Sequence, residues 1–250
     1  MNLKLEVIGF TIEGCVIAEN AGAFRIELCD NPGEGGTTPS YGFIKAAREK
    51  LSIELYPIIR PRGGDFFYNT DEFEIMKSDI SICKELGCDG VVTGILNADG
   101  TIDKKRNREL VELAYPMGVT FHRAFDRVCD ATIALEDIIE TGFERILSSG
   151  LLPNAANGAP TIAALIKQAN GRIIIMPGSG VRSDNIIQIA KDTGATEFHS
   201  SARNYANSKM EYANAAMNEN LQSVAIDEVE LSKMIEVLRI YSNENTIADS

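Results

Sequence analysis

Basic residues are scarce in this chain, and no long uncharged apolar run is present. Its 250 residues contain 24 Lys and Arg against 36 Asp and Glu, which gives a formal charge of −12 and a pI near 4.7. This composition disfavours nucleic acids and anionic membranes as partners, because both are bound through a concentrated Lys/Arg face. The segment Met1–Gly9 lacks the basic region and apolar run of a signal peptide, and no uncharged stretch approaches the roughly 20 residues of a membrane span. We therefore expect a cytoplasmic protein that binds neither nucleic acid nor membrane.

Cysteine motifs are also absent. The cysteines are scattered, with no CxxC pair and no neighbouring Cys/His cluster, at Cys15, Cys29, Cys83, Cys88 and Cys129. Disulfide frameworks and zinc sites need closer or more regular spacing. We predict reduced and mostly buried thiols, and nothing in the sequence implies a nucleotide cofactor.

Short β-rich segments alternate with longer helical patterns. With 44% hydrophobic residues, a chain of this length can bury one large core. The predicted strands are Leu3–Ile8, Phe24–Leu28, Glu54–Arg60, Gly90–Gly94, Val119–His122, Arg145–Ser148, Arg172–Met176 and Glu197–Ser200. Helices between consecutive strands imply a parallel sheet, and eight such units favour closure. We predict an α/β fold, a single-domain (β/α)8 TIM barrel over residues 1–241, whose last helix is Glu228–Tyr241, followed by a polar, frayed tail over residues 242–250.

Four glycines support this repeat. Each ends a helical pattern and leads directly into a strand: Gly22, Gly87, Gly142 and Gly194. Glycine suits the left-handed backbone that closes a helix. Positions five residues after each glycine share one strand face, and two of them are polar, Glu27 and His199.

One long irregular segment follows the eighth predicted strand. It covers Ala202–Val224 and is rich in Asn, Ala and Ser. Long loops in compact domains are usually either functional or poorly ordered. We expect either a lid over the pocket or a poorly ordered crossover.

The two histidines, His122 and His199, fall at the ends of predicted strands five and eight. In this architecture function collects at the C-terminal ends of the strands, because the loops there surround one mouth. A single histidine is more often structural, but two at this height favour a role as acid, base or metal ligand. Glu27 is a candidate base at the same mouth, or the ion-pair partner of a nearby arginine.

Arginines cluster at the end of predicted strand three. Arg60 and Arg62, with Asp65 after two glycines, suit a clamp on a carboxylate or phosphate in which Asp65 holds one arginine in place. The alternative is a solvated, salt-bridged turn. Strand five adds Arg123 and Asp126. Side chains alternate along a strand, so His122 and Arg123 can both face inward only if the strand has already ended there.

Two loops near the end of the barrel are candidate anion sites. Gly178-Ser179-Gly180 follows strand seven, and Ser201 with Arg203 follows strand eight. In this fold these two loops often hold phosphate, since glycines let backbone N–H groups approach an anion. The Gly-rich loop alone is a weak motif, and its position strengthens it.

Five segments together resemble the signature motifs of the CutC copper homeostasis family, and the similarity runs from Glu6 to about Asn214. They occur in the family's order: Arg25–Cys29, Glu34–Ser40, Ile59–Phe66, Thr120–Asp126 and Ser201–Arg203. The resemblance implies a cytoplasmic single barrel with a role in copper homeostasis. It also implies Cu(I) binding by two cysteines, at the ends of strands one and two. Cys29 occupies the second position, but the first is Ile8, whose side chain is no ligand.

Two functions follow from these observations. The first is copper homeostasis through Cu(I), with Cys29 as the retained ligand. The second is an enzyme acting on a small anionic metabolite, phosphorylated or carboxylated, in which arginines hold the anion and Glu27, His122 or His199 move protons. The residues favour the second, while the family name favours the first. The sequence also allows a homo-oligomer.

Overall fold

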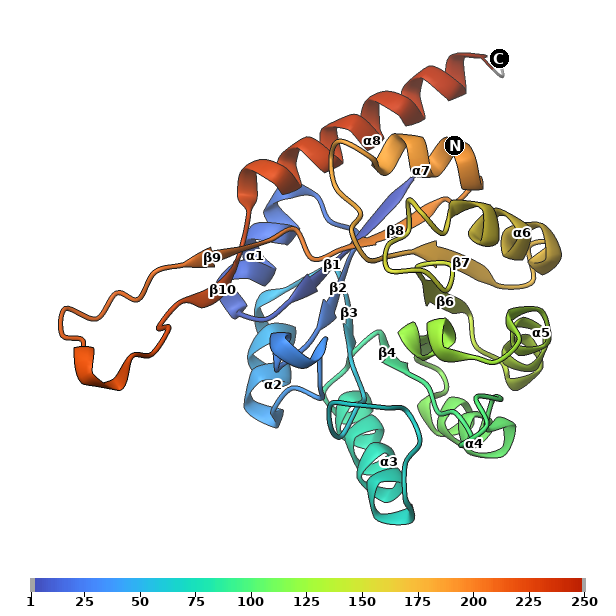
Figure 1. The fold of residues 1–250 in the computed structure, drawn as a ribbon, viewed down its shortest axis with the longest axis horizontal. Helices are drawn as coiled ribbons and strands as arrows, with labels where there is room; N and C mark the ends of the chain where they lie inside the picture. The colour runs from blue at the N-terminus through green and yellow to red at the C-terminus, as the bar shows by residue number, and fades with distance from the viewer. Residues whose placement is uncertain (1–2, 249–250) are drawn as a thin grey trace.

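Parallel strands alternate with helices around one axis in the computed structural model, which describes residues 3–248 (Figure 1). The barrel strands are β1 (Lys4–Gly9), β2 (Arg25–Leu28), β3 (Glu54–Pro57), β4 (Gly90–Thr93), β5 (Gly118–Phe121), β6 (Arg145–Ser148), β7 (Ile174–Pro177) and β8 (Glu197–Ser200). The helices are α1 (Ile12–Ala21), α2 (Tyr41–Lys50), α3 (Thr70–Glu85), α4 (Lys104–Ala114), α5 (Ala131–Thr141), α6 (Ala159–Ala169), α7 (Ile186–Thr193) and α8 (Glu228–Ala248). The predicted single-domain (β/α)8 barrel is confirmed.

Pairing of the first and last barrel strands closes the cylinder. The strands form two parallel runs, β3-β2-β1-β8 and β4-β5-β6-β7, and β7 lies beside β8. β1 pairs with β8 in a register that sets Glu6 opposite His199. The ladder of β3 ends at Pro57 rather than at the predicted Arg60, but Ile59 N still donates to Val92 O at 2.7 Å. Arg60 is therefore carried to the C-terminal mouth of the barrel.

The helix ends follow the glycine pattern of the sequence. Thr11 Oγ1 accepts a hydrogen bond from Gly14 N at the start of α1. The helix closes at Gly22, where φ is 102°, and the equivalent glycines Gly87, Gly142 and Gly194 have φ of 76°, 93° and 74°. These φ values confirm the predicted left-handed positions. Glycine suits them because an L side chain is strained at such angles.

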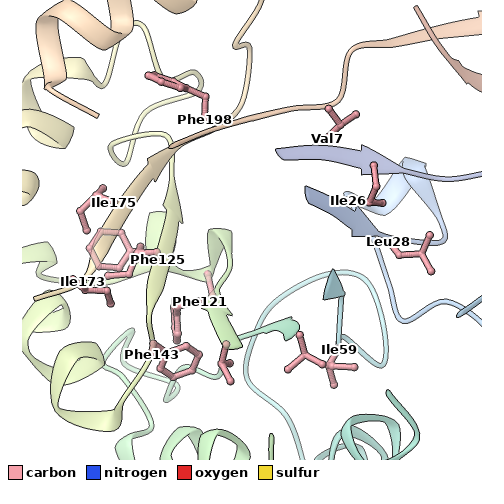
Figure 2. Packing of buried hydrophobic residues seen from close by; sticks show 14 of the residues in the cluster. Val7, Ile26, Leu28, Ile59, Phe121, Phe125, Phe143, Ile173, Ile175 and Phe198 are labelled. Atoms are coloured by element: carbon pink, nitrogen blue, oxygen red, sulfur yellow. The ribbon is translucent and has the colours of Figure 1, made fainter. Parts of the chain in front are cut away.

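The main core lies between the strands and the ring of helices. Side chains on the outward strand face, among them Val7, Ile26, Ile59 and Phe198, have no exposed surface and pack beneath the helices (Figure 2). Burying each side chain of this size contributes roughly 1.5–3 kcal/mol. This apolar layer holds the strand ends, and with them the mouth, in place.

The inside of the barrel carries buried charges instead. Arg25 Nη1 donates to Glu6 Oε2 at 3.1 Å and to Glu197 Oε2 at 3.2 Å, and Arg145 Nε donates to the same Glu197 oxygen at 2.7 Å. Arg25 Nε also binds Glu54. Buried charges are tolerated when they are paired and hydrogen-bonded in this way. The network fills the barrel below the mouth and fixes one side of Glu6.

The segment after β8 forms neither of the two structures predicted for it. β9 (Arg203–Ala206) pairs antiparallel with β10 (Ser223–Ile226), and the connection between them projects away from the barrel (Figure 1). Its side chains from residue 203 to residue 223 are exposed. It is therefore an extended hairpin and not a lid over the mouth, and its paired strands differ from the poorly ordered crossover given as the alternative.

The last helix differs from its predicted length. α8 runs to Ala248, past the predicted end at Tyr241, so residues 242–248 are helical and not a frayed tail. Residues 249 and 250 of the predicted tail lie outside the described part of the chain. Across the described residues, no helix is both long and apolar enough to span a membrane.

Candidate active site at the mouth of the barrel

A small chamber opens at the C-terminal ends of the strands. It measures about 80 Å³ and is lined by Ile8, Glu27, Gly35, Ile58, Arg60, Phe66, His122, Arg123, Leu147 and His199. It continues into a wider mouth of about 450 Å³, whose wall again includes Arg60 and Arg123. The structure thus brings both histidines, Glu27 and two of the predicted arginines to one cavity.

A carboxylate–histidine–carboxylate row lies at the base of the chamber. His199 Nδ1 lies 2.8 Å from Glu6 Oε1, and its Nε2 lies 3.7 Å from Glu27 Oε2. All three side chains are buried. Glu6 therefore orients the imidazole by accepting from Nδ1–H, while Nε2 faces Glu27 and the cavity.

The two carboxyl groups of this row have opposite pKa shifts. Burial raises the pKa of Glu27 to about 7, with the charge of His199 opposing this rise and that of Glu6 adding to it. Burial also works against the charge of Glu6, but the hydrogen bond and charge of His199, together with Arg25 and Arg145, lower its pKa to about 2. Glu6 is thus a fixed anion, whereas Glu27 exchanges its proton near neutral pH.

His199 is favoured in its charged form. Burial opposes the charge, but the hydrogen bond to Glu6 and the charges of Glu27 and Glu6 raise its pKa overall. Groups whose pKa values are moved apart or towards neutrality inside a cavity are typical of acid–base sites.

His122 differs from His199 in being held neutral. Burial, with the nearby charge of Arg60, lowers the pKa of His122 to about 3. Its ring lies against Phe66, with 4.7 Å between ring centroids. Ala124 N donates to His122 Nδ1 at 3.3 Å, so the proton of the neutral ring is on Nε2.

Arg60 is a buried cation held by neutral groups. Its Nη1 donates to Glu34 O at 2.6 Å and Gly36 O at 2.8 Å, its Nη2 donates to Gly64 O at 2.8 Å, and the guanidinium lies over Phe66. Arg60 is only 4% exposed. Among the described residues no carboxylate forms an ion pair with it. Carbonyl dipoles orient this charge without neutralising it.

Arg123 is placed by the turn that follows β5. The strand ends at Phe121 and a 3₁₀ turn over Arg123–Arg127 begins at once, so His122 and Arg123 both reach the chamber. Asp126 Oδ2 accepts from Arg123 Nε at 2.8 Å, while Asp126 Oδ1 accepts from Ser148 Oγ at 2.7 Å. Asp126 is therefore a positioning residue that ties Arg123 to the end of β6.

Several predicted site residues lie outside the chamber. Arg62 pairs with Asp65 and Glu72 on the outer surface, which is the salt-bridged turn given as the alternative for this segment. Gly178 passes close to Leu147 and His199, and Ser179 Oγ donates to Pro153 O. The rest of the glycine loop, including Gly180, does not line the cavity. Ser201 and Arg203 border a narrow groove that shares only Ile8 with the chamber. The predicted phosphate loops thus do not converge with Arg60.

Glu6 was missed by reasoning from the sequence. It sits in the middle of an apolar strand, and the charge itself was the available signal, because an interior strand position rarely carries an unpaired carboxylate. Its role depends on β1 and β8 pairing at the closure of the barrel.

Comparison with known proteins places the chain in a family. A sequence model of the CutC family matches residues 3–204. The chain belongs to the CutC family. It is 51% identical over 212 residues to a CutC family protein of Chromobacterium violaceum, covering 85% of this chain and 86% of the relative. It is 47% identical over 213 residues to the human copper homeostasis protein cutC homolog, covering 85% of this chain and 78% of that one. A solved CutC structure from Streptococcus agalactiae superimposes with a TM-score of 0.76 at 36% identity, covering 80% of this chain and 98% of that one.

The thiol position associated with copper in the CutC family is poorly suited to a metal here. Cys29 has no exposed surface and packs with Ile8, Ile58 and Val92. Burial, together with the charges of Glu27 and Glu6, raises the pKa of this thiol well above its usual range, which opposes the thiolate that binds metals. Burial likewise raises the pKa of Cys15 on α1 to about 12.

The carboxylate–histidine row is the other place to consider for a metal. One ligand atom each from Glu6, Glu27 and His199 lie within 4.8 Å of one another. The donors are oxygen and nitrogen, whereas Cu(I) prefers thiolate and thioether sulfur. Glu6 is already engaged by Arg25 and His199. The row fits proton transfer better than Cu(I).

Proposed function

We propose that this CutC family protein is an enzyme that acts on a small anionic metabolite by acid–base chemistry in the cytoplasm. The observation that carries the proposal is that one chamber is lined both by a buried Arg60 with no ion-pair partner among the described residues and by Glu27, whose pKa is about 7. Arg60 and Arg123 hold the anion. Glu27 and His199 move protons, and Glu6 orients His199.

The buried charge of Arg60 favours an anionic ligand. Removing a cation from water costs free energy unless a counter-charge is supplied. The Arg60 guanidinium donates to backbone carbonyls and has no ion-pair partner among the described residues, so a carboxylate or phosphate entering the chamber would supply the counter-charge that the protein does not. Arg123 lies at the junction between chamber and mouth, and planar guanidiniums bind such groups through paired hydrogen bonds.

Glu27 is the group that favours acid–base chemistry. A catalytic base works best when its pKa lies near the working pH. His199 Nε2 lies 3.7 Å from Glu27 Oε2, within ion-pair range but too far for a hydrogen bond, so the Glu27 oxygens keep their hydrogen-bonding capacity for a ligand. A buried glutamate with this pKa is costly to the fold and is typical of a functional group.

The anion site is tested by thermal shift. Phosphate, sulfate, sugar phosphates and small carboxylates are titrated into wild-type protein, R60M, R123M and the matched control R62M. At 100 times its dissociation constant a ligand adds roughly 2.7 kcal/mol to the free energy of unfolding. We expect a shift for at least one anion that is reduced in R60M and R123M and kept in R62M, since Arg62 lies outside the chamber. No shift, or one unaffected by R60M and R123M, refutes the site.

Copper binding is the second candidate, favoured by the name of the human relative and by the presence of Cys29. Cu(I) is titrated into reduced protein against a competing chelator, with C29S as the test variant and C129S, at an exposed cysteine, as the control. Tight binding that C29S abolishes and C129S keeps would support copper. Equal affinity in wild type and C29S would remove Cys29 as a ligand.

A further inference from the structure

His122 holds a buried hydrogen-bond donor for which the protein supplies no acceptor. Its Nε2 is buried and has no hydrogen-bond partner within the described part of the chain, and the whole residue is only 3% exposed. Nδ1 is occupied by Ala124 N–H, so rotation of the ring cannot satisfy both nitrogens. Leaving such a donor unsatisfied costs roughly 1–3 kcal/mol. Since His122 lines the chamber, a ligand oxygen bound there would supply this acceptor.

A neutral oxygen of the ligand is the acceptor left for this donor once the arginines hold the charged group. The anionic group of the ligand is taken by Arg60 and Arg123, which line both the chamber and its mouth. A neutral imidazole N–H binds a carbonyl oxygen and stabilises the negative charge that develops on it, without handing over its proton. The charge of Arg60 helps keep His122 in that neutral form.

The chamber lining excludes the common alternatives. Among the described residues that line it, none is a lysine, serine, threonine or cysteine. Imine formation needs a lysine amine, and acyl transfer through a serine or cysteine needs that nucleophile. The lining does include Glu27, a carboxyl group that is half ionised near neutral pH.

We propose that the substrate carries a carbonyl group near its anionic group, and that Glu27 removes a proton from the carbon next to this carbonyl while His122 Nε2–H holds the carbonyl oxygen. This inference rests on the proposed function and names its substrate class. The C–H bond breaks and its proton goes to a Glu27 oxygen. The electron pair forms a carbon–carbon double bond, and the carbonyl electrons move to the oxygen, giving an enolate bound by His122. Return of the proton to another face or atom gives epimerisation or isomerisation, with no oxidant or reductant.

Solvent exchange measures this step without knowledge of the product. Anions that shift the melting temperature through Arg60 are incubated with the enzyme in D2O and followed by 1H NMR. The panel pairs carbonyl compounds with their alcohols: pyruvate and 2-oxobutyrate with lactate and 2-hydroxybutyrate, and dihydroxyacetone phosphate with glycerol 3-phosphate. We expect deuterium to enter the carbon beside the carbonyl of one compound and none of the alcohols.

Variants assign the two roles. E27Q should reduce the exchange to background while the Arg60-dependent thermal shift by the same ligand is kept. H122F, which removes the donor, should slow exchange about 10²–10³-fold, the effect typical of losing one such donor. R62M should exchange like wild type.

The outcomes separate this inference from the function on which it rests. Arg60-dependent binding of carbonyl compounds without exchange, or exchange that survives E27Q, overturns the proton abstraction but leaves the anion site standing. Absence of any Arg60-dependent ligand overturns both.

Discussion

Glu6 and Glu27 flank the same imidazole but should change the stability of the protein in opposite directions. Glu27 has a pKa of about 7 against an ordinary 4.5, and Glu6 has a pKa of about 2 against the same reference. At about 1.4 kcal/mol per pKa unit, each difference corresponds to roughly 3 kcal/mol. Both groups are buried, so solvent screening removes little of it.

The two groups act over different pH ranges. The folded protein binds the Glu27 proton more tightly than the unfolded chain does, so this group lowers the free energy of unfolding as the pH rises from 4.5 to 7. Glu6 is ionised more readily in the folded protein, so it stabilises the fold above pH 4.5 and loses that effect as the pH falls towards 2. E27Q should therefore stabilise the protein at pH 8, and E6Q should destabilise it.

Thermal unfolding followed by circular dichroism at pH 8 and pH 4.5 measures both effects. With roughly 2–4 °C per kcal/mol for a domain of this size, E27Q should raise the melting temperature at pH 8 by about 6–12 °C and much less at pH 4.5. E6Q, the matched isosteric change on the other side of His199, should lower it by a similar amount at pH 8. If E27Q is destabilising at pH 8, or if both variants shift the same way, the assignment of Glu27 as the titrating group is refuted.

Three further predictions concern the surroundings of this row. His122 has a pKa of about 3, so 15N NMR should show a neutral ring protonated at Nε2 from pH 8 to pH 5. As the pH falls from 6.5 to 3, the free energy of unfolding of wild type should fall by up to roughly 5 kcal/mol more than that of H122Q, because the unfolded chain takes up the proton first. A charged ring at pH 6 would contradict the burial argument. D126N places a donor against Ser148 Oγ and weakens the contact with Arg123. It should lower the free energy of unfolding in urea by roughly 1–3 kcal/mol and weaken anion binding in the thermal-shift titration. Unchanged anion affinity would show that Asp126 does not position Arg123. G118A points a methyl group at the Tyr56 hydroxyl inside the barrel and should cost roughly 1–3 kcal/mol in the same unfolding assay; a neutral effect would mean that the interior has room to adjust.

Local sequence patterns were enough to predict the barrel and the level of its site along the barrel axis. Periodic apolar segments, helix-ending glycines such as Gly22 and Gly142, and eight strand patterns are local features, and a parallel α/β repeat of this length has few ways to bury its core. The two histidines at predicted strand ends could be placed at the mouth for the same reason. Local sequence pattern was therefore enough to predict how far along the barrel axis a residue lies, because that position follows from its place along a strand.

Which polar residues meet at that level depends on how the strands and loops pack in three dimensions. Arg60 and Arg62 are two residues apart, yet the first is buried in the chamber and the second pairs with Glu72 outside. Glu6 reaches His199 because the first strand pairs with the last. The pKa of about 7 for Glu27 and the neutral state of His122 come from burial and from charges brought in by other strands. Desolvation and Coulomb interactions depend on distances through space, which sequence separation does not specify.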